Sequence, residues 1–135
     1  MIFIDSNILI AYFNEADRNH DLAVKILRDL DKGDYGDAMI SDYIFSEVIS
    51  VTLLKKKDKN TAVQTGKDIL KSKIKIFKIN KNIFQKAWQL FQDYNLKMSF
   101  TDFTNLAILE LLKIKDIDTF DKDFRRIKNI NVVNN

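Results

Sequence analysis

The amino-acid sequence predicts an α/β protein, a three-layer α/β/α sandwich around a mainly parallel five-stranded sheet. Short apolar runs alternate along the chain with longer segments whose apolar residues recur at helical spacing. A helix between two strands returns the chain to the same end of a sheet, so the strands pair in parallel. The 135 residues are 46% hydrophobic and contain no proline, and we expect residues 1–135 to form one domain.

Five apolar runs predict the strands. The first run ends at Asp-Ser-Asn, which carries polar groups from a buried strand into the start of a helix. The second run follows turn residues at 34–37. The predicted strands are residues 1–4, 38–40, 74–79, 117–120 and 130–133.

Amphipathic segments predict the helices. The second helix has Leu22, Ile26, Leu27 and Leu30 on one face and ends before Gly33, a residue that readily closes a helix. Apolar residues at spacings of three and four also predict a broadly buried face in residues 83–94. The predicted helices are residues 8–13, 19–31, 42–53, 60–71, 83–94 and 99–112.

Two helix starts carry capping signals. Ser41 or Asp42 can cap the third helix, and Ser99 with Asp102 resembles a capping box at the start of the last one. The third helix directly follows the second predicted strand, so its first turn lies near the edge of the sheet.

The composition excludes several kinds of active site. The absence of cysteine rules out disulfides, thiolate zinc sites and a cysteine nucleophile, and it favours a cytoplasmic location. The one histidine, His20, starts a helix and provides neither a two-histidine mechanism nor a well-placed Ser-His-Asp triad. Three glycines, at 33, 36 and 66, cannot form a phosphate-binding glycine loop. No apolar run approaches the roughly 20 residues that cross a bilayer, so we expect no membrane segment.

Four acidic residues lie near the carboxyl ends of the predicted strands. Asp5 follows the first strand, and Glu47 lies about two turns into the helix after the second strand. Asp102 lies in the first turn of the last helix, and Asp121 follows the fourth strand. Ligands bind at this edge of an open parallel sheet, so we expect the four side chains to converge. Crowded carboxylates repel one another and require a cation, and all-oxygen ligands favour Mg²⁺ or Mn²⁺. Such an ion binds phosphate oxygens and can orient or activate a water molecule, so we expect hydrolysis of a phosphodiester.

Each acidic residue also has a structural interpretation. Asp102 can complement a helix N-terminus, Asp121 or Asp123 can be a turn residue, and Glu47 can lie on a partly exposed helix edge. Asp5 is the strongest signal, because a charge directly after a buried strand has few structural roles. The joint pattern carries more weight than any one member.

Neighbouring residues extend the predicted site. The net charge of +3 is compatible with a polyanionic partner, and Arg125 and Arg126 lie close enough to Asp121 in sequence to contact a phosphate. Four aromatic residues lie on helices that flank the site, where they can belong to the core, a groove or a dimer face: Tyr12, Phe13, Tyr43 and Phe45.

Four segments, in order, resemble the successive motifs of PIN-domain nucleases. They are Ile2-Phe3-Ile4-Asp5-Ser6-Asn7-Ile8-Leu9, Ser46-Glu47-Val48, Ser99-Phe100-Thr101-Asp102 with Ala107 behind it, and Thr119-Phe120-Asp121-Lys122-Asp123-Phe124. The resemblance spans essentially the whole chain. In size the chain is most similar to the VapC-type toxins of bacterial and archaeal toxin-antitoxin pairs.

This resemblance implies roles for individual residues. Asp5, Glu47 and Asp102 match the near-invariant acids of the family, and Asp121 matches its more variable fourth acid. Asp5, Asp102 and Asp121 are the expected metal ligands. Supporting polar groups are expected from Asn7, Thr119 and Asp123, and the choice between Asp121 and its neighbours Asp118 and Asp123 as fourth acid rests on the Thr-x-Asp pattern.

The resemblance further implies an Mg²⁺- or Mn²⁺-dependent endoribonuclease that cuts RNA, forms a homodimer and is blocked by a cognate antitoxin protein. Two alternatives stay open. One is a housekeeping PIN nuclease that matures RNA, and the other is a non-catalytic binding module with the same fold. A receiver-like signalling domain is disfavoured, because the third predicted strand ends in Ile79-Asn80-Lys81 and not in a phosphoacceptor aspartate.

Overall fold

The computed structural model describes residues 1–134, which form five strands, six α-helices and one 3₁₀ helix. The strands are β1 (Ile2–Ile4), β2 (Ala38–Ser41), β3 (Lys75–Phe77), β4 (Asp116–Asp118) and β5 (Asn131–Val132). The helices are α1 (Ser6–Tyr12), α2 (His20–Asp31), α3 (Asp42–Lys56), α4 (Lys59–Lys71), α5 (Lys81–Asp93), α6 (Phe100–Leu111) and the 3₁₀ helix η1 (Lys122–Arg126). Every predicted element is present, with small shifts at its ends.

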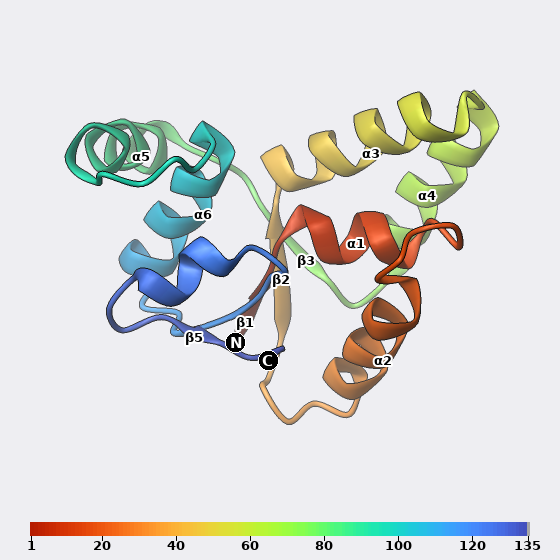
Figure 1. Ribbon diagram of the computed structural model, residues 1–135, viewed down its shortest axis with the longest axis horizontal. Coiled ribbons are helices and arrows are strands. Elements are labelled where there is room, and N and C mark those ends of the chain that lie inside the picture. Colours follow the sequence, from red (N-terminus) through yellow and green to blue (C-terminus); the bar gives the residue numbers. More distant parts are fainter. Residues whose placement is uncertain (135) are drawn as a thin grey trace.

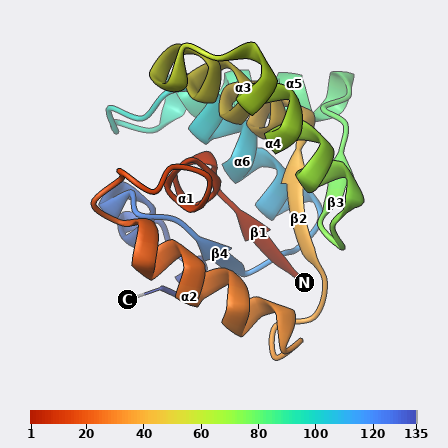
Figure 2. The same ribbon diagram turned by 90° about the vertical axis from the view of Figure 1, so that its right-hand side faces the viewer.

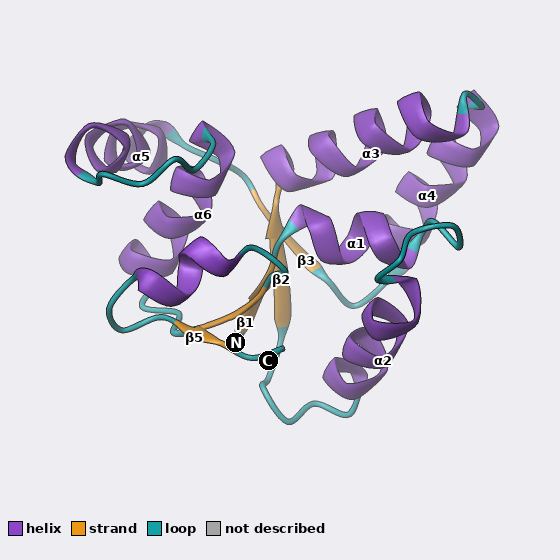
Figure 3. Ribbon diagram, viewed as in Figure 1, coloured by secondary structure: helices purple, strands orange, loops and turns teal. Residues whose placement is uncertain are grey.

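The strands form one parallel sheet in the order β3-β2-β1-β4-β5. The chain moves outward from β1 through β2 to β3 and then returns to place β4 on the other side of β1. Because crossovers between parallel strands are right-handed, this reversal puts the later helices on the opposite face of the sheet. Figures 1 and 3 show α1 to α4 on one side and α5 with α6 on the other, and Figure 2 views the molecule from the side of α1 to α4. The predicted three-layer sandwich is confirmed.

The central strand β1 is buried on both faces. Ile2, Phe3 and Ile4 have no exposed surface, and neither do Ile8 of α1 and Phe103 of α6. Burial of each large apolar side chain stabilises the fold by about 1.5–3 kcal/mol. The strand is therefore firmly anchored, and so is the residue that follows it, Asp5.

Three predicted helix boundaries have the expected caps. The Ser41 hydroxyl accepts a hydrogen bond from Ile44 N at 3.1 Å, and Ser99 and Asp102 form a complete capping box. Gly33, just beyond the end of α2, has a φ of +84°, a conformation that favours glycine. The starts of α3 and α6 are thus fixed at the edge of the sheet.

Strand β4 ends at Asp118, two residues before its predicted end at residue 120. Beyond that point the backbone N–H groups bond to side chains and not to a neighbouring strand. Phe120 N donates to Asn7 Oδ1 at 3.1 Å, and Asp121 N donates to Thr119 Oγ1 at 3.0 Å. Polar side chains of the predicted site therefore turn the chain away from the sheet.

The prediction of a broadly buried face on residues 83–94 is wrong for three of its four aromatic members. Phe84, Trp88 and Phe91 are 48%, 53% and 42% exposed, because α5 lies at the outside of its layer (Figure 1). Phe84 and Phe91 still contact Phe100 of α6, with ring centroids 5.4 and 6.3 Å apart. Leu22 of the predicted α2 face and Leu53 of α3 are also exposed. Within residues 1–134 no helix is long and apolar enough to cross a membrane.

Candidate active site

The carboxyl ends of β1 and β4 meet where the chain reverses direction across the sheet. Asp5 directly follows β1 and Thr119 directly follows β4. Ile4 pairs with Asp118, and Asp5 N donates to Asp118 O at 2.9 Å. In α/β sheets the crevice beyond such a switch point is the usual ligand-binding position.

Asp5 is 3% exposed and is surrounded by neutral hydrogen-bond donors. Its Oδ1 accepts from Ser6 N at 2.8 Å and from Asn105 Nδ2 at 3.2 Å. Its Oδ2 accepts from Thr119 Oγ1 at 2.7 Å and from Asn7 Nδ2 at 3.3 Å. Two of the three predicted supporting residues, Asn7 and Thr119, thus contact the Asp5 carboxylate and together fix its orientation.

The side chains of Asp5, Glu47 and Asp102 lie close enough for their charges to affect one another's pKa values. Burial raises the pKa of Asp5 to about 7; the Thr119 hydroxyl lowers it, and the charges of Asp102 and Glu47 raise it. Burial also raises the pKa of Glu47, with the Ser6 side chain opposing and Asp102 adding to the increase. Residues 5, 47 and 102 are far apart in sequence, so the fold gathers these negative charges at one edge of the sheet.

Asp102 both caps its helix and faces the other acids. Burial raises its pKa, hydrogen bonds from Ser99 lower it, and the charges of Asp121 and Asp123 raise it. Asp102 Oδ2 accepts from Ser99 N at 3.0 Å. Asp121 Oδ1 similarly caps η1 by accepting from Asp123 N at 2.9 Å. Asp102 and Asp121 therefore cap helices, as their structural interpretation expects, and this role is compatible with a place in the site.

Asp118 stands apart from this group. It is buried, and neither of its carboxylate oxygens has a hydrogen-bond partner in the described residues. Burial and the neighbouring charge of Asp116 raise its pKa to about 6, with no contribution from Asp5, Glu47 or Asp102. Of the three candidates for the fourth acid, Asp121 and Asp123 are the two whose charges reach Asp102.

Most of the candidate acids have no counter-ion in the described part of the chain. Within residues 1–134, no lysine or arginine pairs with Asp5, Glu47, Asp102 or Asp121. Arg125 and Arg126 are exposed on η1, and Arg126 Nη1 lies 3.9 Å from Asp123.

An all-oxygen donor set with uncompensated negative charge suits a hard divalent cation. The side chains of residues 1–134 nevertheless include no ready-made group of three metal ligands. The chemistry of the donors fits Mg²⁺ or Mn²⁺, although the carboxylates of residues 1–134 do not already surround one position.

Asn105 belongs to the site but is not among the residues predicted from the sequence. It is fully buried in α6 and donates to Asp5, and its Oδ1 has no hydrogen-bond partner in residues 1–134. A signal for it does exist in the sequence. Asparagine is unusual beside the apolar run Leu106-Ala107-Ile108-Leu109, and it follows Asp102 by three residues, which places both on one helix face.

A small hollow adjoins the acidic residues. It has a volume of about 320 Å³ and is lined by Tyr43, Ser46 and Glu47 of α3 and by Thr101 of α6. The hollow lies where the first turns of two helices from opposite layers approach each other. Tyr43 thus lies in a groove, one of the three positions open to it from the sequence.

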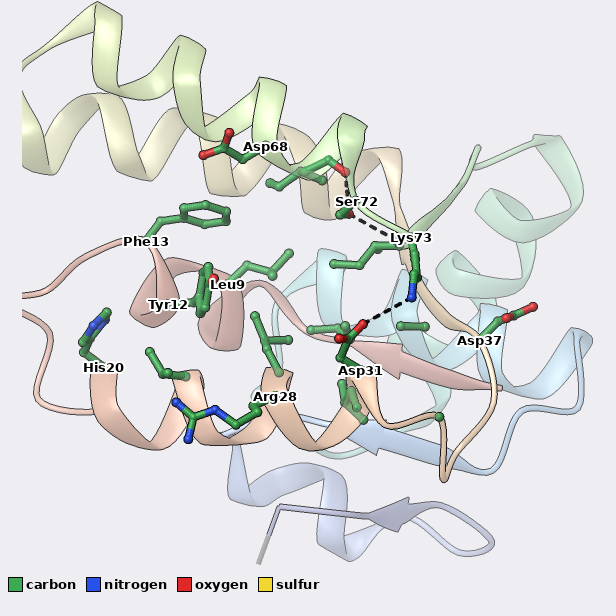
Figure 4. Close-up of a pocket in the computed structure, with 18 of the residues that line it drawn as sticks. Leu9, Tyr12, Phe13, His20, Arg28, Asp31, Asp37, Asp68, Ser72 and Lys73 are labelled. Carbon is green, nitrogen blue, oxygen red and sulfur yellow. Dashed lines mark hydrogen bonds and ion pairs between the residues drawn. The ribbon is translucent and has the colours of Figure 1, made fainter.

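A larger hollow of about 1140 Å³ lies between α1, α2 and α4. Figure 4 shows Leu9, Tyr12 and Phe13 within it, and Lys73 reaching toward Asp31 across its rim, where Nζ and Oδ1 are 3.7 Å apart. Tyr12 and Phe13 therefore line a groove, whereas Phe45 packs with Ile49 near Gly66 on α4.

Comparison with known proteins identifies the family of this chain. The family model described as PIN domain matches residues 2–130. The chain belongs to the PIN domain family. The matched range of this PIN domain includes Asp5, Glu47, Asp102 and Asp121. A sequence comparison with curated proteins gives no match.

Three solved structures are similar to this PIN domain. Mycobacterium tuberculosis VapC20, described as a sarcin-ricin loop cleaving toxin, has a TM-score of 0.82 at 20% identity, covering 93% of this chain and 94% of that one. A toxin-antitoxin complex from Klebsiella pneumoniae has a TM-score of 0.66 at 22% identity, covering 98% and 97%. VapBC2 from Rickettsia felis, bound to a DNA fragment from its promoter, has a TM-score of 0.68 at 19% identity, covering 98% and 97%. At these identities the likeness establishes the fold.

Proposed function

We propose that this PIN domain is a metal-dependent endoribonuclease and the toxin of a toxin-antitoxin pair. The observation that carries the proposal is that the charges of Asp5, Glu47 and Asp102 act on one another, while no lysine or arginine of residues 1–134 pairs with any of the three. The similarity in fold to a toxin that cleaves the sarcin-ricin loop supports RNA as the substrate. The similarity to two toxin-antitoxin complexes supports an antitoxin as the partner.

In this proposal each side chain of the site has its own role in the reaction. Asp5, Asp102 and Asp121, or Asp123 in place of the last, would hold Mg²⁺ or Mn²⁺. A bound divalent ion of this kind acts as a Lewis acid toward a phosphate oxygen and lowers the pKa of water. Glu47, which in residues 1–134 neither caps a helix nor bonds to Asp5, would accept a proton from the attacking water. Thr119, Asn7 and Asn105 hold Asp5 in place, and Arg125 and Arg126 are candidates to contact the RNA backbone.

Incubation of the purified protein with a panel of labelled RNAs tests this function. We expect cleavage with Mn²⁺ or Mg²⁺ and none with EDTA. Cleavage that the chelator leaves unchanged would refute the proposed chemistry. The position of the gene separates a toxin from a housekeeping nuclease, since a small antitoxin gene directly upstream favours the toxin.

We also infer a homodimer formed through α5. Phe84, Trp88 and Phe91 are each 42% or more exposed and recur along one face of the helix. Trp88 and Phe91 stack with ring centroids 5.8 Å apart, so they form one continuous apolar surface. An exposed aromatic patch of this kind is typical of an interaction site, and a two-fold dimer can cover it with the same patch of a second copy.

Trp88→Glu tests this interface. We expect the variant to be monomeric where the unmodified protein is a dimer, with dimer affinity weakened by about 30-fold or more, because central aromatic anchors cost about 2 kcal/mol or more when lost. Light scattering coupled to size-exclusion chromatography measures the mass. Leu70→Glu is the matched control, since Leu70 is 65% exposed on the opposite layer. A dimer that survives Trp88→Glu and dissociates with Leu70→Glu places the interface elsewhere.

The hollow between α1, α2 and α4 is the surface that we assign to the antitoxin. Its volume of about 1140 Å³ exceeds the roughly 300–1,000 Å³ of small-molecule pockets. Apolar residues such as Leu9, Phe13 and Ile69 line it, together with charged residues that include Arg28 and Asp68. An apolar side chain or helix face from a partner protein suits such a groove.

A further inference from the structure

The small hollow beside Glu47 has the chemistry of a binding site. Tyr43, Ser46 and Glu47 occur at spacings of three and four in α3, so they lie on one helix face, and Thr101 of α6 faces them across the hollow. Glu47 is therefore shared between this hollow and the acidic group.

The groups that line the hollow are free to bind a ligand. Within the described residues, neither the Tyr43 hydroxyl nor those of Ser46 and Thr101 takes part in a hydrogen bond of the protein. The Tyr43 ring is only partly buried and stacks on no other aromatic ring of residues 1–134. An aromatic face beside three hydroxyl groups can offer a stacking surface together with hydrogen-bond donors and acceptors.

The size and position of the hollow indicate which kind of ligand it can bind. A volume of about 320 Å³ lies at the lower end of the roughly 300–1,000 Å³ range of small-molecule sites, so the hollow can take one nucleoside but not a base pair with its neighbours. If the acidic group engages the phosphate that is cleaved, a hollow that shares Glu47 with it lies next to the adjoining nucleotide.

We propose that this hollow binds the base and ribose of one unpaired ribonucleotide beside the cleaved bond, with the base stacked on Tyr43. This inference rests on the proposed nuclease function and makes it more specific. Single-stranded RNA offers its bases for stacking on aromatic side chains, whereas paired bases are unavailable. The hydroxyls of Ser46 and Thr101 are suited to the ribose 2′-hydroxyl, which is both a donor and an acceptor.

Binding and cleavage by Tyr43 variants test the proposal. Loss of one base–aromatic stack weakens binding by roughly 5- to 150-fold, so we expect Tyr43→Ala to raise the KM for a short single-stranded RNA by about ten-fold and to change kcat little. Tyr43→Phe keeps the ring and should retain the unmodified KM. Thermal unfolding of each variant shows whether the fold is intact. An unchanged KM in Tyr43→Ala overturns the proposal.

An abasic substrate distinguishes stacking from a general effect on structure. RNA that lacks the base beside the cleaved bond should bind the unmodified protein and Tyr43→Ala equally weakly, because neither can form the stack. A 2′-deoxy substitution at the same nucleotide tests the hydroxyl contacts, with weaker binding expected. If Tyr43→Ala weakens binding of the abasic RNA as much as that of the intact RNA, the stacking is refuted.

The outcome for this hollow can be separated from that of the proposed function. Fluorescence anisotropy with labelled RNA measures binding to the Asp5→Asn protein, with and without Tyr43→Ala, and needs no cleavage. Ring-dependent binding of single-stranded RNA, together with an unmodified protein that cuts no RNA with Mn²⁺ or Mg²⁺, would retain the hollow and reject the nuclease. Cleavage without any dependence on the ring would retain the nuclease and reject the hollow.

Discussion

Asp5→Asn is expected to abolish RNA cleavage and to stabilise the fold. The substitution removes a carboxylate that two other acids face across the crevice. A catalytic metal ion provides several kcal/mol of transition-state stabilisation, so loss of a ligand should lower kcat/KM by about a thousand-fold or more. Cleavage of labelled RNA with Mn²⁺ measures the loss. Asp34→Asn, at an exposed turn, is the matched control and should retain full activity.

The gain in stability has a defined pH dependence. Because the pKa of Asp5 is about 7 in the folded protein and near 3.8 when unfolded, the folded state binds the extra proton between these values. The contribution of Asp5 to the free energy of unfolding therefore falls as pH rises from about 4 to about 7, by an amount of order 4 kcal/mol. Asp5→Asn removes this loss, so its melting temperature should exceed that of the unmodified protein at pH 8 by roughly 5 °C or more and match it near pH 4. Equal melting curves at both pH values would contradict the burial of a charged Asp5.

Mn²⁺ or Mg²⁺ is expected to raise the melting temperature at pH 8 and to have much less effect at pH 5.5. Ions bind the ionised carboxylates, and at the lower pH a proton on Asp5 competes with them. A ligand at about 100 times its Kd stabilises the folded state by about 3 kcal/mol, which corresponds to roughly 6–15 °C for a domain of this size. Differential scanning fluorimetry with and without EDTA measures the shift.

Variants of the acidic residues give this measurement its controls. Asp5→Asn should show no shift with Mn²⁺, and Asp34→Asn should show the full shift. Comparison of Asp121→Asn with Asp123→Asn identifies the fourth acid, since both charges raise the pKa of Asp102. A shift of the same size in Asp5→Asn would place the ion outside the crevice.

The sequence predicts the sheet and the edge at which the acids meet, because both depend on local patterns. Strand and helix periods alternate along the chain, and Asp5 follows the first apolar run directly. The capping box at Ser99 and Asp102 is also a local signal, and the structure contains it. How closely Asp5 and Asp102 approach is a tertiary property, which periodicity does not encode.

Other features depend on contacts between distant segments. Apolar spacing in residues 83–94 cannot distinguish a face that packs in the core from one that stays exposed, so Trp88 is predicted as buried and is not. The end of β4 depends on bonds from Phe120 and Asp121 to side chains of Asn7 and Thr119, one of them more than a hundred residues away in sequence. The role of Asn105 depends in the same way on its meeting with Asp5.

The pairing of β1 with β4 has a consequence for synthesis of the protein. Asp5 emerges first from the ribosome, but the Thr119 hydroxyl that holds it is 114 residues later in the chain. Since domains are synthesised from the N-terminus at about 5–20 residues per second, a nascent chain carries an incomplete crevice until nearly all of it has been translated. A product truncated before β4 therefore lacks the hydroxyl group that orients Asp5.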